Sequence, residues 1–165
     1  MSSRRARSRL GRRNPPGAEL EQIEAVYRRS TARLRRVAAA IIGDRDAALD
    51  AVQTGFSIAV RRRAEFLGDG PLEAWAWRIV VNEARDVRAR LLVRDGAGLG
   101  GAYLGGSRKP DVLPELSERQ RLVMFLRYYA DLDYPTIARV LGIGEGTVDA
   151  TMKQAHARLL EEVSP

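Results

Sequence analysis

The sequence contains no cysteine and a single histidine, His156, and each shortage excludes a class of site. Without cysteine there can be no disulfide, no thiol nucleophile and no Cys-based metal site, and one histidine cannot form a histidine cluster. No apolar run approaches the roughly 20 residues that a membrane-spanning helix needs. We therefore expect a cytoplasmic protein with no membrane insertion, no metal, no other cofactor and no catalytic residue set.

Lysine is also scarce, since only Lys109 and Lys153 occur, yet arginine leaves the chain with a formal net charge of +7 and a pI of about 10.5. This charge indicates a polyanionic partner, with nucleic acid ahead of a membrane surface. Hydrophobic residues make up 45% of the chain, which is enough for a packed core.

Composition divides the chain into four segments. Residues 1–17 hold six arginines and no acid, which predicts a disordered basic arm that either adds non-specific DNA affinity or is only a solvated tail. Residues 18–93 have apolar positions at steps of three and four, which predicts a domain of three helices. Glycine dominates residues 94–112, which we interpret as a flexible linker rather than a long surface loop. Residues 113–165 form a second domain, and we expect the two to move independently.

The second domain has the signals of a helix-turn-helix. Ser117 and Gln120 have capping-box spacing at the start of its first helix. Asp133 is placed to cap a short helix with Pro135 in its first turn, and Gly142 to end that helix in a left-handed conformation. No strand-like alternation occurs in the chain. The predicted fold class is therefore all-α, with two small helical domains, the C-terminal one containing a helix-turn-helix.

The C-terminal segment reads LSERQRLVMFLRYYADLDYPTIARVLGIGEGTVDATMKQAHARL. The N-terminal domain contains GDRDAALDAVQTGFSIAV, with a D-x-V-Q-x-x-F core, and a W-x-x-R-I-x-x-N string follows it. In this order and with this gap, the C-terminal segment resembles the fourth region, and the N-terminal segment the second region, of the bacterial RNA polymerase sigma factors of the extracytoplasmic-function (ECF) type. The resemblance implies an alternative sigma factor that binds core RNA polymerase, directs it to promoters and helps to melt them.

The resemblance also implies which residues contact each partner. Asp50 and Gln53 match the positions that bind core polymerase. Contacts with the minus-ten element are implied for Phe66, Leu67, Gly68, Asp69, Trp77, Arg78, Asn82, Arg85 and Arg88. Trp75 is expected in the core with Leu72 and Ile79, because these three share one helical stripe. An anti-sigma factor is raised as a candidate third partner.

The fourth region is implied to bind the minus-thirty-five element in the major groove. Val148, Met152, Ala155 and Leu159 repeat at core spacing. The candidates for DNA contact are Thr147, Thr151, Lys153, Gln154 and Arg158. In the family's usual pattern, basic residues stand at the positions of Asp149 and Thr151, and acids are common where Leu49 and Thr54 stand. We therefore expect a recognition helix with weak affinity of its own.

Three other interpretations compete with this one. The first is a degenerate sigma-like regulator that binds DNA or protein without programming polymerase, which the substitutions at Leu49, Thr54, Asp149 and Thr151 favour. The second is an enzyme, but GLGGAYLGG lacks the preceding strand and the Lys-Ser/Thr ending of a phosphate-binding loop. The third is a helical adaptor, which would not bind nucleic acid at all.

Overall fold

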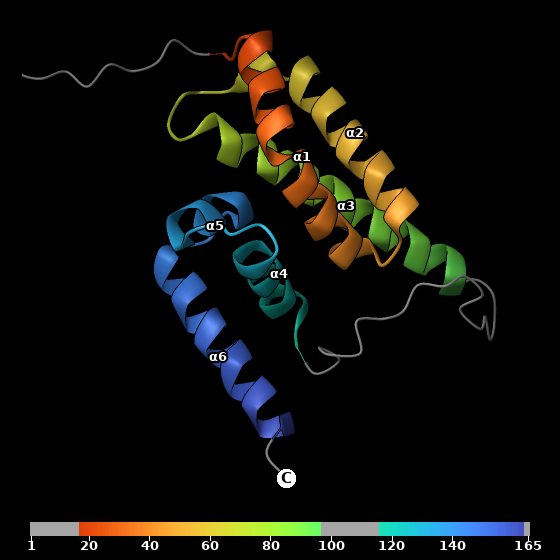
Figure 1. Cartoon of the computed structure of the whole chain (residues 1–165), viewed down its shortest axis with the longest axis vertical. Helices are drawn as coiled ribbons and strands as arrows, with labels where there is room; N and C mark the ends of the chain where they lie inside the picture. Colours follow the sequence, from red (N-terminus) through yellow and green to blue (C-terminus); the bar gives the residue numbers. More distant parts are fainter. Residues whose placement is uncertain (1–16, 97–115, 164–165) are drawn as a thin grey trace, which may run out of the picture.

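The structure is a computed structural model that describes residues 17–96 and 116–163. Within these ranges the chain forms six α-helices and one short 3-10 helix, and no strand. The prediction of an all-α protein is confirmed. Helices α1 to α3 form one group, and α4 to α6 form a second group beside it (Figure 1).

The first group owes its helix boundaries to local capping. Helix α1 spans Leu20–Ile42 and begins with a reciprocal capping box between Glu19 and Gln22. Gly43, at φ 83°, ends it in the left-handed conformation. Asp44 accepts a hydrogen bond from the Ala47 N–H and so caps α2, Arg45–Arg61. The 3-10 helix η1, Arg63–Glu65, then leads into the loop before α3, Leu72–Gly96.

The core of the first group lies where these three helices meet. Gly55 permits the close approach of α2 and α3, because a Cβ at this position would lie only 2.8 Å from Cγ2 of Val80. Trp77 is the largest side chain that is fully buried. The other buried apolar side chains around it include Ile23, Val26, Leu34, Val37, Val52, Phe56, Val80 and Val81.

The second group is a helix-turn-helix preceded by one helix. Helix α4 spans Glu118–Tyr128 and has the capping box between Ser117 and Gln120 that the sequence predicts. Asp133 caps α5, Tyr134–Leu141, through the Thr136 N–H at 2.9 Å, and Gly142 ends it at φ 66°. Helix α6, Glu145–Val163, follows. These capping predictions are confirmed.

The two groups pack against one another, which the Gly-rich segment did not predict. Arg33 of α1 donates a hydrogen bond to the carbonyl oxygen of Ala130 at 3.1 Å, across the two groups. The buried apolar side chains of both groups form one continuous cluster. This structure holds the two groups in contact, and their independent motion in the free chain stays a prediction. Of the predicted linker, residues 94–96 belong to α3, and residues 97–112, like residues 1–16 of the predicted arm, lie outside the described residues.

Candidate nucleic-acid interface

The candidate polymerase-binding residues lie on the outer face of α2. Both Asp50 and Gln53 are exposed, so a partner can reach them. Asp50 also lines a shallow groove of about 260 Å³ between α2 and α3, whose walls are Ala47, Asp50, Ala51, Thr54, Glu83, Val87 and Arg90. The groove combines small apolar side chains with charges of both signs, which suits a partner helix with a polar rim.

The loop before α3 presents part of the predicted minus-ten set. Leu67 is 71% exposed, Asp69 is exposed, and Gly68 has a φ of 70° that favours glycine. Phe66 differs, because it is buried and its ring centroid lies 5.8 Å from that of Trp75. The expectation that Phe66 meets a base is therefore corrected: in this structure Phe66 holds the loop against α3.

The burial of the two tryptophans of α3 is the reverse of the expected one, in which Trp75 lies in the core and Trp77 is accessible to DNA. Trp77 is fully buried, with the Arg33 guanidinium 6.0 Å from its ring centroid. Its Nε1 has no hydrogen-bond partner within the part of the chain that is described. Trp75 is only partly buried and lines a cavity. Trp77 cannot stack on a base while it is buried, so its assignment to the minus-ten element is corrected.

Four polar residues of α3 from the predicted set divide into two pairs. Arg85 forms an exposed ion pair with Glu118 at 2.9 Å, and Arg88 donates to the carbonyl oxygen of Ile41 at 2.6 Å. The side chains of Arg78 and Asn82 are exposed and make no hydrogen bond or ion pair with the other described residues. Arg78 and Asn82 are therefore the pair best placed to contact nucleic acid.

Helix α6 buries three residues of the predicted stripe, Val148, Met152 and Ala155, while Leu159, the fourth, is only partly buried. Thr151 is buried too, at 6% exposure, so its assignment to DNA contact is corrected. The reason is geometric, because position 151 lies three residues after Val148 and on the same face of the helix. The other four candidates on this helix are exposed, namely Thr147, Lys153, Gln154 and Arg158.

The only lysine of α6 is paired within its own helix. Lys153 Nζ lies 2.8 Å from Oδ2 of Asp149, one turn earlier. This hydrogen bond and the carboxylate charge raise the pKa of Lys153. The positive charge offered to a phosphate is thus partly neutralised. In the sequence, the i, i+4 spacing of Asp149 and Lys153 is the signal that predicts this ion pair.

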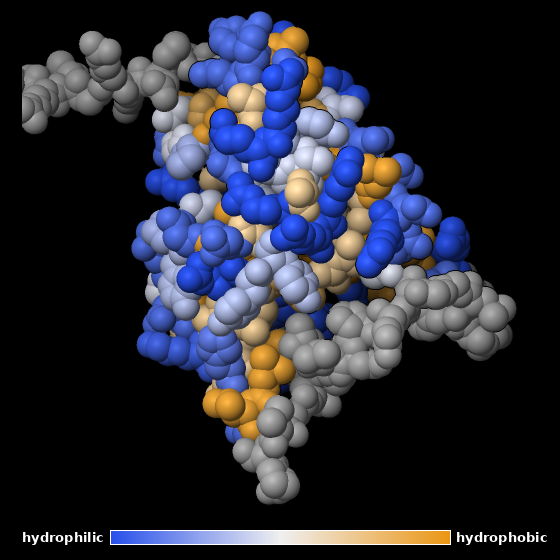
Figure 2. Space-filling view, viewed as in Figure 1, coloured by the Kyte–Doolittle hydropathy of each residue, from blue (hydrophilic) through white to orange (hydrophobic). Residues whose placement is uncertain are grey.

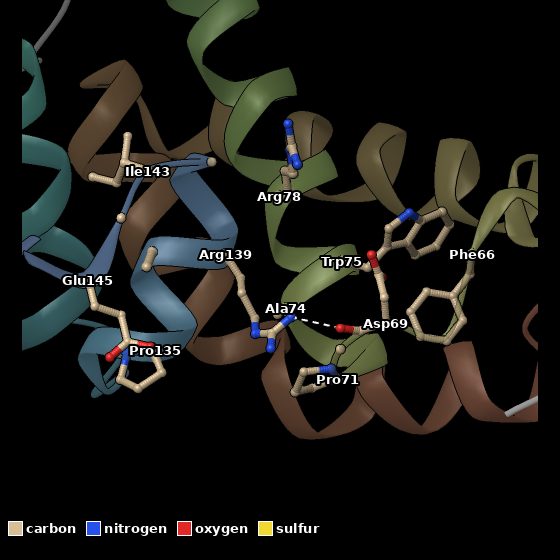
Figure 3. Close-up of a pocket in the computed structure, with 14 residues that line it drawn as sticks. Phe66, Asp69, Pro71, Ala74, Trp75, Arg78, Pro135, Arg139, Ile143 and Glu145 are labelled. Atoms are coloured by element: carbon tan, nitrogen blue, oxygen red, sulfur yellow. Dashed lines mark hydrogen bonds between the residues drawn. The ribbon is translucent and has the colours of Figure 1, made fainter. Parts of the chain in front are cut away.

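Arg139, an exposed residue of α5, is not among the residues that the sequence predicted to contact a partner. Its Nη1 donates to the main-chain carbonyl oxygen of Asp69 at 2.9 Å, which Figure 3 shows as a dashed line. Beside this contact lies a cavity of about 460 Å³ between α3 and the helix-turn-helix. Phe66, Trp75 and Arg78 line it from one group, and its walls in the other group include Pro135, Ala138, Arg139, Gly142, Ile143, Gly144 and Glu145.

Hydrophilic side chains cover most of the face drawn in Figure 2, and apolar ones gather near the C-terminal end of α6. Among the described helices, none has the length and apolar character that crossing a membrane would require. Within the same residues, no three side chains of the His, Cys, Asp and Glu types come together as metal ligands.

Two family models match the chain in succession. Residues 26–91 match the family described as Sigma-70 region 2, and residues 110–159 match Sigma-70, region 4. The ECF RNA polymerase sigma factor SigL of Mycobacterium tuberculosis is 30% identical over 84% of this chain and 86% of its own. SigM of the same organism is 29% identical over 83% of this chain and 74% of its own.

Two solved structures have the same fold. One is CnrH in complex with the cytosolic domain of CnrY, with a TM-score of 0.69, 24% identity, and coverage of 88% of this chain and 90% of that one. The other is the sigma factor RpoE in complex with the anti-sigma factor NepR from Bartonella quintana, with a TM-score of 0.67, 22% identity, and coverage of 86% and 96%.

Proposed function

The chain belongs to the ECF family of RNA polymerase sigma factors, and we propose from this premise how its surfaces divide the work of promoter recognition. It is an alternative sigma factor that directs RNA polymerase to promoters. The observation that carries this function is that one chain holds a region 2 unit and a region 4 unit in that order. Its partners are core RNA polymerase and promoter DNA.

We assign residues 18–93 to polymerase and minus-ten binding and residues 113–165 to minus-thirty-five binding, with residues 94–112 as the linker. Sigma factors act by binding and positioning, so the polymerase performs the chemistry of RNA synthesis. The work of this protein takes place in the cytoplasm, beside the polymerase. The basic arm, residues 1–17, adds non-specific attraction to DNA through its arginines.

Polymerase binding starts at the outer face of α2. Asp50 and Gln53 supply the polar contacts, and the groove beside them accepts apolar side chains of a polymerase helix. Val52 and Phe56 face inward and keep α2 in place. The energy of such an interface comes mainly from its few buried anchors, while exposed polar groups choose the partner.

Promoter melting depends on the loop before α3 and on the exposed face of α3. Arg78 supplies a cation for a phosphate and Asn82 a polar side chain for a base edge. Leu67 and Asp69 extend the surface at the loop. A strand held single needs such a cationic track, since each phosphate that is neutralised releases counterions.

The helix-turn-helix then binds the minus-thirty-five element with α6 in the major groove. Gln154 and Thr147 are the exposed side chains that can contact base edges, and Arg158 can contact a phosphate. Lys153 contributes little while Asp149 holds it. An anti-sigma factor is a candidate regulator of the whole chain.

The direct test is reconstitution with core polymerase on a promoter library, with transcription start sites as the readout. We expect defined start sites that core polymerase alone does not give. Asp50→Asn with Gln53→Ala should weaken capture of polymerase. Glu21→Gln, which removes another exposed carboxylate from α1, should not weaken this capture.

A second function, a sigma-like regulator that does not program polymerase, is favoured by one observation. This is the pairing of Asp149 with Lys153, which removes a cation from the DNA-facing helix. If the chain binds DNA but neither captures polymerase nor yields start sites, this second function holds and the first fails.

A further inference from the structure

The last residue of the basic arm, Gly17, is fixed beside the loop before α3. Its N–H donates to the carbonyl oxygen of Phe66 at 2.6 Å, and the N–H of Ala18 donates to the carbonyl oxygen of Arg63 at 2.9 Å. Gly17 has a φ of 98°, which favours glycine, and Ala18 is buried in the core. The chain therefore enters α1 through a fixed point next to η1 and this loop (Figure 1).

The charge of the chain is concentrated in the residues that precede this fixed point. Residues 1–16 contain six arginines and no acid, so they hold six of the seven net positive charges. The remaining residues carry 22 basic and 21 acidic side chains and are nearly neutral as a whole. Electrostatic attraction to DNA grows with the number of phosphates that cations neutralise. The basic arm is therefore the most cationic segment that this chain offers to DNA.

The described surface around the fixed point carries two further cations. Arg61, the last residue of α2, is exposed and makes no hydrogen bond or ion pair with the other described residues. The exposed side chain of Arg63 donates to a neutral acceptor, the carbonyl oxygen of Val60, at 2.9 Å. Arg62 differs, because Glu65 neutralises it at 2.6 Å. Arg61 and Arg63 thus keep their full charge beside the arm.

Chain length limits which part of a promoter the arm can reach. Sixteen residues precede Gly17, and a fully extended segment of this length spans at most about 55 Å, at roughly 3.4 Å per residue. By their names, the two promoter elements lie about 25 base pairs apart, which is roughly 85 Å of duplex at about 3.4 Å per base pair. An arm that starts beside the loop assigned to the minus-ten element is therefore too short to reach the minus-thirty-five element.

We propose that the basic arm, together with Arg61 and Arg63, binds the backbone phosphates that flank the minus-ten element. This inference rests on the function proposed above. Once the loop has met the minus-ten element, the fixed point at Gly17 makes the contact of the arm intramolecular, at an effective concentration on the order of millimolar. Guanidinium groups bind phosphates through paired N–H donors and carry no sequence information there. The arm therefore strengthens binding at this end of the promoter for all sequences alike.

The position of the arm on DNA can be mapped with an iron chelate that cleaves DNA close to its attachment site. The chain has no native cysteine, so Ser8→Cys provides a single attachment site within the arm. The readout is cleavage of an end-labelled promoter by the holoenzyme. We expect cleavage within about ten base pairs of the minus-ten element, because nine residues separate position 8 from Gly17. Cleavage at the minus-thirty-five element, uniform cleavage or no cleavage would overturn the proposal.

A matched control tests whether the fixed point places the arm. Residues 2–16 of the labelled chain are moved to follow Pro165, which keeps the charge and changes only the point of attachment. This chain should lose the cleavage beside the minus-ten element. If that cleavage were retained, attachment at Gly17 would not position the arm, and the proposal would be overturned.

The contribution of charge is measured by the salt dependence of promoter binding in the holoenzyme. Replacing the six arginines of the arm by glutamine should flatten the log–log slope by about 2–5 units, since each phosphate contact contributes about 0.7–0.9 units. The substitutions are R4Q, R5Q, R7Q, R9Q, R12Q and R13Q. An unchanged slope would overturn the proposal. So would weaker capture of core polymerase without DNA, because the arm would then bind a protein partner.

The cations beside the fixed point have a matched control of their own. Arg61→Gln with Arg63→Gln should flatten the slope by about 1–2 units. Arg62→Gln with Glu65→Gln removes a neutral ion pair from the same surface and should leave the slope unchanged. Equal slopes in these two double variants would overturn the part of the proposal that concerns Arg61 and Arg63.

The outcome separates this inference from the function itself. The chain with six glutamines should keep its start sites at the same positions, because phosphate contacts carry no sequence information. A wild-type chain that yields no start sites with core polymerase would contradict the proposed function, and this inference with it. A chain that yields start sites but fails the cleavage and salt tests would contradict this inference alone.

Discussion

Helices α3 and α6 both face DNA in our proposal, yet they present different charge. On α3, Arg78 is exposed and makes no ion pair within the described residues. On α6, Lys153 is exposed but is held by Asp149 at 2.8 Å. A cation that is already paired releases fewer counterions when it meets a phosphate. The comparison indicates that α3 supplies more of the electrostatic attraction, and that α6 depends on the rest of the complex, since tethering makes its contact intramolecular.

The two groups also differ in how they are stabilised. The first is built around Trp77, which is fully buried among three long helices. The second includes two shorter helices, α4 with 11 residues and α5 with eight residues between the cap at Asp133 and the stop at Gly142. A short helix gains little from propagation, so its caps matter more.

The largest expected effect is on the core of the first group. Trp77→Ala should lower the free energy of unfolding by about 3–5 kcal/mol, because it leaves a large cavity. Trp77→Phe keeps a ring and removes the Nε1–H that has no partner among the described residues, so it should cost less than half as much. Denaturant unfolding measures both. If the Trp77→Ala chain were as stable as wild type, Trp77 would not be a core residue and would again be a candidate for DNA contact.

The next largest effect is expected on the preference of α6 for particular base pairs. Gln154→Ala should relax preference at one base pair by about 1–3 kcal/mol, if the amide contacts that base with two hydrogen bonds. Arg158→Ala, one turn further along the same exposed face, should instead weaken all sequences alike, because its proposed contact is a phosphate. Holoenzyme binding to a set of single-base promoter variants separates the two. If Gln154→Ala weakened binding to all promoter variants alike, Gln154 would not be a residue that recognises a base.

The cap of α5 gives an effect that depends on pH. Asp133→Ala should lower the free energy of unfolding by about 1 kcal/mol near pH 7. Hydrogen bonds from Thr136 lower the pKa of Asp133 below its ordinary value of 3.8. The stability from this carboxylate is therefore present above that value and lost as the pH falls through the lowered pKa. Thermal unfolding at pH 7 and pH 2 should show the variant's deficit shrinking in acid; a constant deficit would contradict this.

Reversing the charge of Asp149 should bring the electrostatic attraction of α6 for DNA closer to that of α3. Asp149→Lys frees Lys153 and adds a cation, so the salt slope of DNA binding should steepen by about one unit per new phosphate contact. Between 50 and 200 mM salt, a slope that is steeper by one unit adds a roughly fourfold loss of DNA affinity. Asp149→Asn frees Lys153 without a new cation and should give a smaller change. An unchanged slope in both variants would show that this face of α6 does not meet DNA.

The sequence predicts the helices of this fold well, because their boundaries depend on local chemistry. Gly43, Asp44, Ser117, Asp133 and Gly142 each occupy the capping position that their residue type favours. The resemblance supplies the function that these helices serve. Neither source predicts that the two groups pack together, because Arg139 and Arg33 both donate across the groups to main-chain carbonyl oxygens, and a carbonyl has no signature in the sequence.

The errors at Trp77 and Thr151 have a common cause in helix geometry. Helix α3 carries two adjacent apolar stripes, and periodicity alone does not tell which one is fully buried. The stripe with Trp77, Val80 and Ala84 is fully buried, while Trp75 and Ile79 on the neighbouring stripe are only partly buried. Thr151 is buried on α6 for the same kind of reason, since the buried face includes both the i+3 and the i+4 neighbours of Val148.

The comparison of α3 with α6 is tested most directly by the salt dependence of promoter binding in two holoenzymes, one carrying Arg78→Ala and one carrying Lys153→Ala. Each variant removes one exposed cation from one DNA-facing helix. We expect Arg78→Ala to flatten the log–log slope by about 0.7 to 0.9 units and Lys153→Ala to leave it nearly unchanged. A slope that Lys153→Ala flattens as much as Arg78→Ala does would contradict the account.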